Sequence, residues 1–364
     1  MLTYILRRLI LMVPTLLGVT AVVFFIMALS PGGVGGMEDA GSGELDSRSA
    51  QFQRDYLNQR YGLDQPKLVQ YGRWLNRVSP VGFDSGEAGK IAWGMPTFKW
   101  PDLGESLAKR RPVTQLYREA LPITLLLNAV TTPLVYVCAI VLGLYMARTR
   151  GGLFDNLSGV FVLILWSIPV MAAGVLLIGF LANRDQLYLF PVGGLSSANA
   201  ANMPFLPGYI ADPGGGTVWT AGWLLDRAWH LVLPVLCLTY GGLAFLAKLT
   251  RGSMIETLQA DYSRTARAKG VSANGVLFRH AFRNGLIPLI TVSASLLPGL
   301  LAGSIIVEQI FSLPGMGKLT LEAIFARDRE LVLAGTLVSG VLGLVSILIA
   351  DLGYALADPR VSYD

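Results

Sequence analysis

Seven long stretches of the sequence contain no Asp, Glu, Lys or Arg. One of them, residues 186–211, is rich in Pro, Gly, Asn and Ser and reads as a loop, and the other six, which are apolar, constrain the fold more than any other feature. Each encloses between 20 and 29 residues, and about 20 helical residues are enough to cross a bilayer core of about 30 Å. The six apolar stretches lie between Arg8 and Glu38, Glu119 and Arg148, Asp155 and Arg184, Arg227 and Lys248, Arg283 and Glu308, and Glu330 and Asp351. The sequence therefore predicts an all-α integral membrane protein with six transmembrane helices.

The composition argues against a metalloprotein, a disulfide-bonded protein and an enzyme that hydrolyses nucleotides. Charged residues make up 15% of the chain, against roughly 25% in soluble domains. Both cysteines, Cys138 and Cys237, fall inside predicted spans, which excludes a disulfide framework and a cysteine-based zinc site. Two histidines are too few for a histidine-rich metal site, and the sequence has no P-loop signature. We therefore expect no catalytic residue, no metal and no cofactor in this chain.

The distribution of basic residues predicts the orientation of the chain. With the N-terminus inside, the inside segment 248–283 holds seven basic and two acidic residues, whereas the outside segment 30–119 holds 12 basic and 11 acidic residues. Cytoplasmic loops carry the excess of Lys and Arg in membrane proteins. We therefore expect both termini to be cytoplasmic, and the net charge of +5 gives no reason to expect a nucleic-acid partner.

The chain is predicted to have four parts. Residues 1–29 form an N-terminal transmembrane helix, and residues 30–119 form a small external subdomain, because this segment is too long for a simple connector. Residues 120–357 form a five-helix core that includes a basic cytoplasmic loop at 250–284, and residues 358–364 form a tail. Residues 184–227 form a second outside loop that is rich in Gly and Pro.

The loop at 250–284 is the segment most informative about mechanism. Residues 252–270 are predicted to form one helix that ends at Gly270, a natural helix stop, and VLFRHAFRN forms a second short helix. The small residues Ala266 and Ala268 permit close docking into the groove of a partner protein. Its cations, including Arg267 and Lys269, equally suit a helix on the membrane surface that meets anionic headgroups. The residues alone leave both readings open.

The same segment carries a family resemblance. DYSRTARAKG, followed by VLFRHAFRN and Ile287-Pro288, resembles the EAA loop of ATP-binding-cassette (ABC) importer permeases in the dipeptide/oligopeptide branch. Arg264 and Thr265 stand where the strict pattern has Glu and Ala. Further segments resemble that branch in the same order, namely RRLILMVPTLLGVTAVVFF, YGLDQP, DLGESL, IFSLPGMGKLTLEAIFARD and ADPR. LFPVGGLSSAN and the ending DPRVSYD look most like the microcin C and peptide permease subgroup.

The resemblance implies a type I ABC importer permease in the bacterial inner membrane. Such a chain forms half of a translocation path for short peptides or peptide-like compounds, such as microcin C-like molecules, and is a transport subunit rather than an enzyme. Its implied partners are a second homologous permease subunit in a heterodimer, cytoplasmic ATPase subunits that bind ATP and Mg, an external substrate-binding protein, and the lipid bilayer. The implied ATPase-coupling residues are Tyr262, Thr265, Ala266, Arg267, Ala268, Lys269 and Gly270.

Four polar residues in predicted spans could line a translocation path, namely Asn128, Thr131, Ser293 and Ser295. Such side chains also join neighbouring helices, and the sequence leaves both roles open. Glu308 is expected at headgroup level near the outer membrane boundary. The alternative class is a secondary transporter or channel without an ATPase partner. A secondary transporter usually shows two related halves and charged residues within its spans, and we find neither in the sequence.

Overall fold

The computed structural model describes residues 2–29, 62, 64–83, 95–211, 216–290, 292–293 and 304–357. These residues form two compact units, each of which is a separate body. The first unit is built from the described parts of Met1–Glu119 and Leu319–Leu348. The second unit is built from the described parts of Ala120–Lys318 and Ile349–Asp358.

The first unit joins the first and last long helices to a small subdomain. Its elements are α1 (Leu2–Leu29), α3 (Lys67–Val78), β1 (Val81–Gly82), β2 (Thr97–Phe98) and most of α14 (Arg329–Ala357). The strands β1 and β2 pair antiparallel, with Val81 opposite Phe98. Trp74 and Val78 of α3 pack against Phe24 of α1 and Leu333 of α14. The apolar face of α3 therefore covers both long helices.

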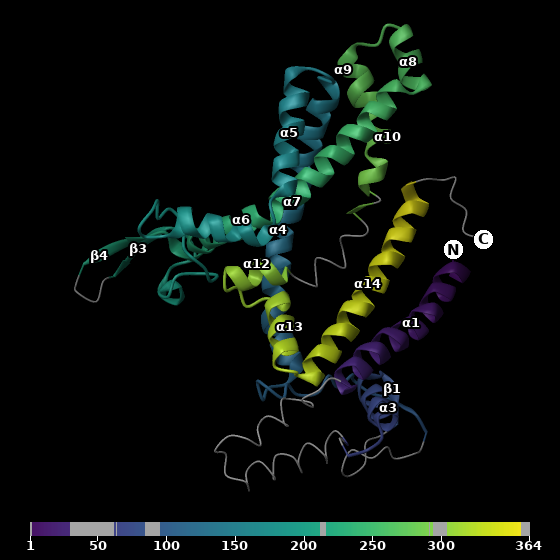
Figure 1. Ribbon diagram of the computed structural model, residues 1–364, viewed down its shortest axis with the longest axis vertical. Helices are drawn as coiled ribbons and strands as arrows, with labels where there is room; N and C mark the ends of the chain where they lie inside the picture. The colour runs from purple at the N-terminus through teal and green to yellow at the C-terminus, as the bar shows by residue number, and fades with distance from the viewer. Residues whose placement is uncertain are drawn as a thin grey trace. The chain divides into compact units, whose positions relative to one another are not determined.

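The second unit holds the remaining long helices and the predicted coupling loop (Figure 1). Its helices are most of α4 (Val113–Arg148), α5 (Leu153–Ser167), α6 (Val170–Leu177), the π-helix η4 (Ile178–Ala182), the short 3₁₀-helix η5 (Ala200–Asn202), α7 (Gly222–Gln259) and α12 (Ile305–Ile310). A hairpin of β3 (Gly208–Ala211) and β4 (Thr217–Thr220) precedes α7. The helix α13 (Met316–Phe325) begins in this unit and ends in the first.

The third predicted span is sharply bent. The axes of Leu153–Ser167 and Val170–Ala182 meet at 93°, so α6 runs across the direction of α5 (Figure 1). The bend lies at Ile168, whose backbone is extended because the following residue, Pro169, disfavours a helical conformation before it. The hydroxyl of Tyr240 donates to the carbonyl of Ile168 at 2.8 Å, which satisfies a backbone acceptor that the broken helix leaves free.

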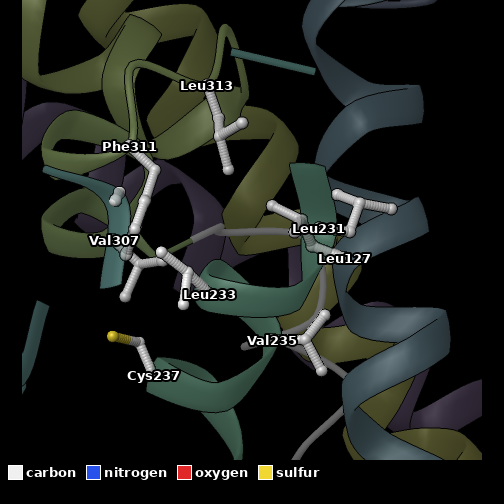
Figure 2. Packing of buried hydrophobic residues seen from close by; sticks show 9 residues of the cluster. Leu127, Leu231, Leu233, Val235, Cys237, Val307, Phe311 and Leu313 are labelled. Atoms are coloured by element: carbon white, nitrogen blue, oxygen red, sulfur yellow. The ribbon is translucent and has the colours of Figure 1, made fainter. Parts of the chain in front are cut away.

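Two features hold the second unit together. The helices α4 and α7 approach closely at Gly143, where an added Cβ would lie 2.5 Å from Cβ of Thr250 and 2.6 Å from the carbonyl oxygen of Ala247. An apolar core joins side chains of α4, α7 and the α12 segment (Figure 2), namely Leu127, Leu231, Leu233, Val235, Cys237, Val307, Phe311 and Leu313. Cys237 is thus buried as a small apolar side chain, whereas Cys138 is exposed.

The described residues bear out the predicted all-α membrane fold. Four helices are long and apolar enough to cross a membrane, and the bent pair α5–α6 makes a fifth if it is one span. The predicted span between Arg283 and Glu308 includes residues 291 and 294–303, which lie outside the described residues. The sequence does not predict the two short hairpins, because each strand has only two to four residues.

Candidate functional site

The predicted coupling loop begins with a break in the helix. The sequence predicts a continuous helix over residues 252–270, but α7 ends at Gln259 and a new helix, α8 (Asp261–Ala268), follows. Ala260 between them is extended, with φ −63° and ψ 153°. Its carbonyl accepts the backbone N–H groups of Ser263 at 3.0 Å and Arg264 at 3.1 Å, and so starts α8. An eight-residue helix is marginal by itself, so α8 depends on its contacts with the rest of the chain.

Gly270 ends α8 in the way that the sequence predicts. Its φ is +80°, a left-handed conformation that glycine adopts without steric cost. The N–H of Gly270 donates to the carbonyl of Arg267 at 2.9 Å, and the N–H of Val271 donates to that of Ala266 at 3.2 Å. These two bonds satisfy carbonyls at the end of the helix and turn the chain away from it.

One face of α8 is directed into the chain. Ser263 and Ala266 are buried, and the hydroxyl of Ser263 donates to the carbonyl of Thr257 at 2.7 Å. The guanidinium of Arg267 donates to the carbonyl of Leu258, one of the last carbonyls of α7. Ala266 is thus packed inside the loop in this chain, and its implied role in coupling to an ATPase stays a prediction. The side chain of Arg267 fastens α8 to α7 through this hydrogen bond to the Leu258 carbonyl.

The opposite face of α8 is open to solvent. Tyr262, Thr265 and Lys269 are exposed and follow one another at helical spacings of three and four, which places them on one side. Ala268 beside them is also exposed. We call Tyr262, Thr265, Ala268 and Lys269 the outer face of α8. It offers the phenol ring of Tyr262, the hydroxyl of Thr265 and the cation of Lys269.

A second short helical segment seats this loop on the long helices. After α9 (Ala273–Gly275), the π-helix η6 (Val276–Ala281) continues into α10 (Phe282–Gly285), where the sequence predicts a helix. Their buried side chains form one apolar cluster with α4 and α7, made of Leu144, Ala147, Met254, Leu277 and Ala281. The hydroxyl of Ser253 also donates to the carbonyl of Gly285 at 2.8 Å. The loop that carries the outer face of α8 is thus packed against α4 and α7.

The candidate path residues differ in the contacts that they make within the chain. The amide of Asn128 donates to the carbonyl of Thr124 at 2.9 Å, and the hydroxyl of Ser293 lies 2.9 Å from that of Tyr136. Thr131 is buried, and its hydroxyl oxygen has no hydrogen-bond partner among the residues that the structure describes. Ser295 lies outside the described residues. The contact of Ser293 is of the kind that joins neighbouring helices.

An ion pair that the sequence did not reveal lies close to the coupling loop. Asp155, in the first turn of α5, is 3% exposed and Arg251 of α7 is 34% exposed. Nε and Nη2 of Arg251 donate to the two carboxylate oxygens of Asp155 at 2.6 and 2.8 Å. The N–H of Gly151 donates to the same carboxylate at 2.9 Å. Sequence offers only a weak signal here, an acidic residue in a first helical turn, because 96 residues separate the partners.

Glu308 is a second buried acidic residue. Its side chain is fully enclosed by protein, and its expected place near the outer membrane boundary stays a prediction. The hydroxyl of Thr124 donates to it at 3.0 Å, and the N–H of Lys318 donates to it at 2.9 Å. Thr124 in turn accepts the N–H of Met316 at 2.8 Å. Glu308 therefore fastens the turn between α12 and α13 to α4.

A third buried group lies in the first unit, at the start of α14. Ser106 donates to Asp328 at 2.5 Å, Arg329 donates to Gln70 at 3.1 Å, and Glu330 accepts hydrogen bonds from Arg77 and Arg329. All three consecutive residues, 328–330, are almost fully buried. We call them the 328–330 cluster. It joins α14 to α3 and to the segment before α4.

Comparisons with known proteins show the family of the chain. Residues 139–363 match the family described as binding-protein-dependent transport system inner membrane component, and residues 1–128 match the family that describes its N-terminal part. The chain is 35% identical over 364 residues to the oligopeptide transport system permease protein AppB of Bacillus subtilis, with 100% of both chains covered. It is 31% identical over 377 residues to the inner membrane ABC transporter permease protein YejB of Escherichia coli O157:H7, with 99% of each covered. A putative peptide transport system permease protein of Brucella abortus is 34% identical over 364 residues, again with 99% of each covered.

The family match and the relatives together cover the chain from end to end. The apolar helices agree with a multi-pass protein of the bacterial inner membrane, and the relatives are transport permeases. The chain therefore belongs to the binding-protein-dependent transport system inner membrane components, the permease subunits of ABC transporters.

Proposed function

We propose that this permease imports short peptides or peptide-like compounds and that the outer face of α8 docks onto a cytoplasmic ATPase subunit. The observation that carries the docking proposal is the division of α8 into two faces. The inner face, with Ser263 and Ala266, is used within the chain, whereas the outer face is exposed on a packed base. A membrane-surface helix needs large apolar side chains directed into the bilayer. On the outer face of α8, Tyr262 is the one side chain with a large apolar part.

The proposed cargo follows from the relatives. Their names assign oligopeptide transport to the Bacillus subtilis protein and peptide transport to the Brucella abortus protein. We extend this to short peptides and to peptide-like compounds, of which microcin C-like molecules are one case. An external substrate-binding protein would deliver the cargo, and a second homologous permease subunit would complete a heterodimeric path. Asn128, Thr131, Ser293 and Ser295 are the proposed polar residues along this chain's side of that path.

The proposed coupling works by differential binding. Both termini and the coupling loop would be cytoplasmic, as the excess of basic residues in segment 248–283 favours. ATP and Mg would bind to the ATPase subunits, and no step of hydrolysis would involve this chain. Nucleotide binding can shift the permease only through contacts that differ between its inward-facing and outward-facing states. The outer face of α8 would supply those contacts.

The test is a copurification and transport assay with charge reversal on the outer face. The chain is expressed with the ATPase subunits, the second permease and the binding protein encoded beside it, and the complex is reconstituted in vesicles. Lys269→Glu with Tyr262→Ala should lower the ATPase retained on the permease at least about fivefold, the small end of typical coupling effects. Lys67→Glu, which makes the same charge change at an exposed position in α3, should retain it.

Two results would contradict the proposal. If the wild-type chain retains no ATPase and still transports peptide down a gradient, it is a secondary transporter or channel. If the double variant retains the ATPase and peptide-stimulated hydrolysis in full, α8 is a surface helix and docking occurs elsewhere.

A further inference from the structure

The last turns of α7 contact three different parts of the second unit within five residues. Thr250 lies against Gly143 of α4, and Arg251 binds Asp155 of α5. Met254 is buried in the apolar cluster that the coupling loop forms with α4 and α7. Any movement of this part of α7 is therefore passed to α4 and the loop through apolar packing, and to α5 through the ion pair.

The connection to α5 differs from the others because it is polar. The apolar cluster beneath the coupling loop contains residues of α4, α7 and η6, and none from α5. At the other end of α5, the ring centroids of Trp166 and of Phe245 in α7 are 5.9 Å apart. Each end of α5 thus has its own contact with α7, and at the end nearer to the coupling loop this contact is the ion pair of Asp155 and Arg251. Beside the pair, the ring of Phe154 contacts that of Tyr145 in α4, with the ring centroids 6.2 Å apart.

The geometry of the pair suits the transmission of a directed movement. Two parallel N–H···O bonds between a guanidinium and a carboxylate fix both distance and orientation, which a single ammonium contact does not. The N–H of Gly151 completes the set on Asp155. Gly151, with φ +73°, lies in the short connection between α4 and α5. Its hydrogen bond therefore holds that connection to the same carboxylate.

We propose that Asp155 and Arg251 are positioning residues that carry the movement of the coupling loop to α5. This inference depends on the proposed function, because it takes the coupling loop to be driven by an ATPase. When the ATPase displaces α8, the end of α7 moves with it, and the ion pair obliges the start of α5 to follow. Without the pair, the loop and α7 respond to the nucleotide, but the start of α5 loses its charged contact with α7.

The two partners differ in burial, and this makes the test sharp. Arg251→Gln leaves the carboxylate of Asp155 nearly buried with only the N–H of Gly151, whereas Asp155→Asn leaves an arginine that is one-third exposed and can reach water. A buried charge without its partner is costly, and removal of both partners relieves that cost. Assembly should therefore fall most in Arg251→Gln and recover in the double variant Asp155→Asn/Arg251→Gln.

The experiment measures peptide imported per ATP hydrolysed by the complete transporter in vesicles. If the pair is a mechanical link, the double variant assembles with its ATPases and hydrolyses ATP, yet its transport ratio stays at least about fivefold below that of the wild type. Arg251→Lys should give an intermediate ratio, since it keeps the charge but loses the paired bonds. Glu322→Gln, which removes the exposed ion pair between Lys109 and Glu322, is the matched control and should keep the wild-type ratio.

The outcomes separate this inference from the proposed function. A normal transport ratio in the double variant overturns the link and leaves the pair with a structural role. A ratio that falls in Glu322→Gln as well shows a general loss of integrity and also overturns it. If the wild-type chain retains no ATPase at all, the proposed function fails first, and the link fails with it.

Discussion

The guanidinium of Arg267 binds the carbonyl of Leu258, nine residues earlier in the chain. This contact closes the reversal between α7 and α8, since Arg267 belongs to the last turn of one helix and Leu258 to the last turn of the other. An arginine that the sequence suggests as a contact for a partner protein thus binds within its own chain.

Replacement of Arg267 by alanine should loosen α8 without altering its outer face. The lost hydrogen bond is exposed, so we expect a cost of about 1 kcal/mol, which corresponds to roughly fivefold faster hydrogen exchange at the amides of α8. Exchange measured by mass spectrometry on the purified chain would show it. Arg264→Ala is the control, because its exposed ion pair with Asp261, 3.7 Å apart, contributes little. Equal exchange in the two variants would contradict the role of Arg267.

Gly270 should tolerate asparagine but not valine. No heavy atom lies within 4 Å of an added Cβ, so the effect of a substitution comes from the backbone conformation alone. A left-handed conformation costs an ordinary residue roughly 1–2 kcal/mol, whereas asparagine adopts it readily. Peptide-stimulated ATP hydrolysis should therefore fall in Gly270→Val and be largely retained in Gly270→Asn. Similar losses in both variants would show that the side chain, not the conformation, matters.

Glu308→Ala should destabilise the chain, although Glu308 lies far in sequence from the Thr124 hydroxyl that it binds. The substitution removes the acceptor for that hydroxyl and for the Lys318 N–H, and each buried donor left unpaired costs about 1–3 kcal/mol. A lower melting temperature in detergent is the expected result. Gln309→Ala, at the exposed neighbouring position, should leave the melting temperature unchanged. A melting temperature for Glu308→Ala equal to that of the control would contradict the buried network.

Gly143→Ala should disrupt the contact between α4 and α7. The added Cβ meets both the Thr250 side chain and the backbone carbonyl of Ala247, and overpacking of this kind costs about 1–3 kcal/mol. Thr250→Ala should not rescue it, because the Ala247 carbonyl cannot be removed. Gly241→Ala is the control, since nothing lies within 4 Å of its added Cβ. Thermal unfolding of these variants in detergent provides the measurement, and full rescue by Thr250→Ala would overturn the expectation.

The parts of the fold that sequence predicts well are those set by local patterns. The absence of charge locates the spans, because a buried charge in lipid is costly whatever surrounds it. Gly270 is predictable as a helix stop because glycine adopts the left-handed conformation without steric cost. The second short helix, which the sequence predicts for VLFRHAFRN, is present from Val276 to Gly285.

The parts that sequence misses are those set by tertiary contacts. The spacing of residues in α8 shows which ones share a face, but not which face is buried, so the pattern alone does not reveal that Ala266 packs within the chain. The break at Ala260 has no proline or glycine to announce it. The pair of Asp155 and Arg251 and the bond between Thr124 and Glu308 join residues about a hundred or more positions apart. Many cations and hydroxyls are equally available to such groups, and only the packing of the helices selects one.

The 328–330 cluster has a consequence for the order in which the chain is made. Arg77 and Glu330 are 253 positions apart, and Gln70 and Arg329 are 259 positions apart. A growing chain exposes the segment around α3 long before the start of α14 has been synthesised. During that time its arginine and glutamine have none of these partners, and charged groups are not buried alone. The subdomain after the first span can therefore reach its final packing only after the last span has been synthesised. The packing of α3 is thus coupled to completion of the polypeptide.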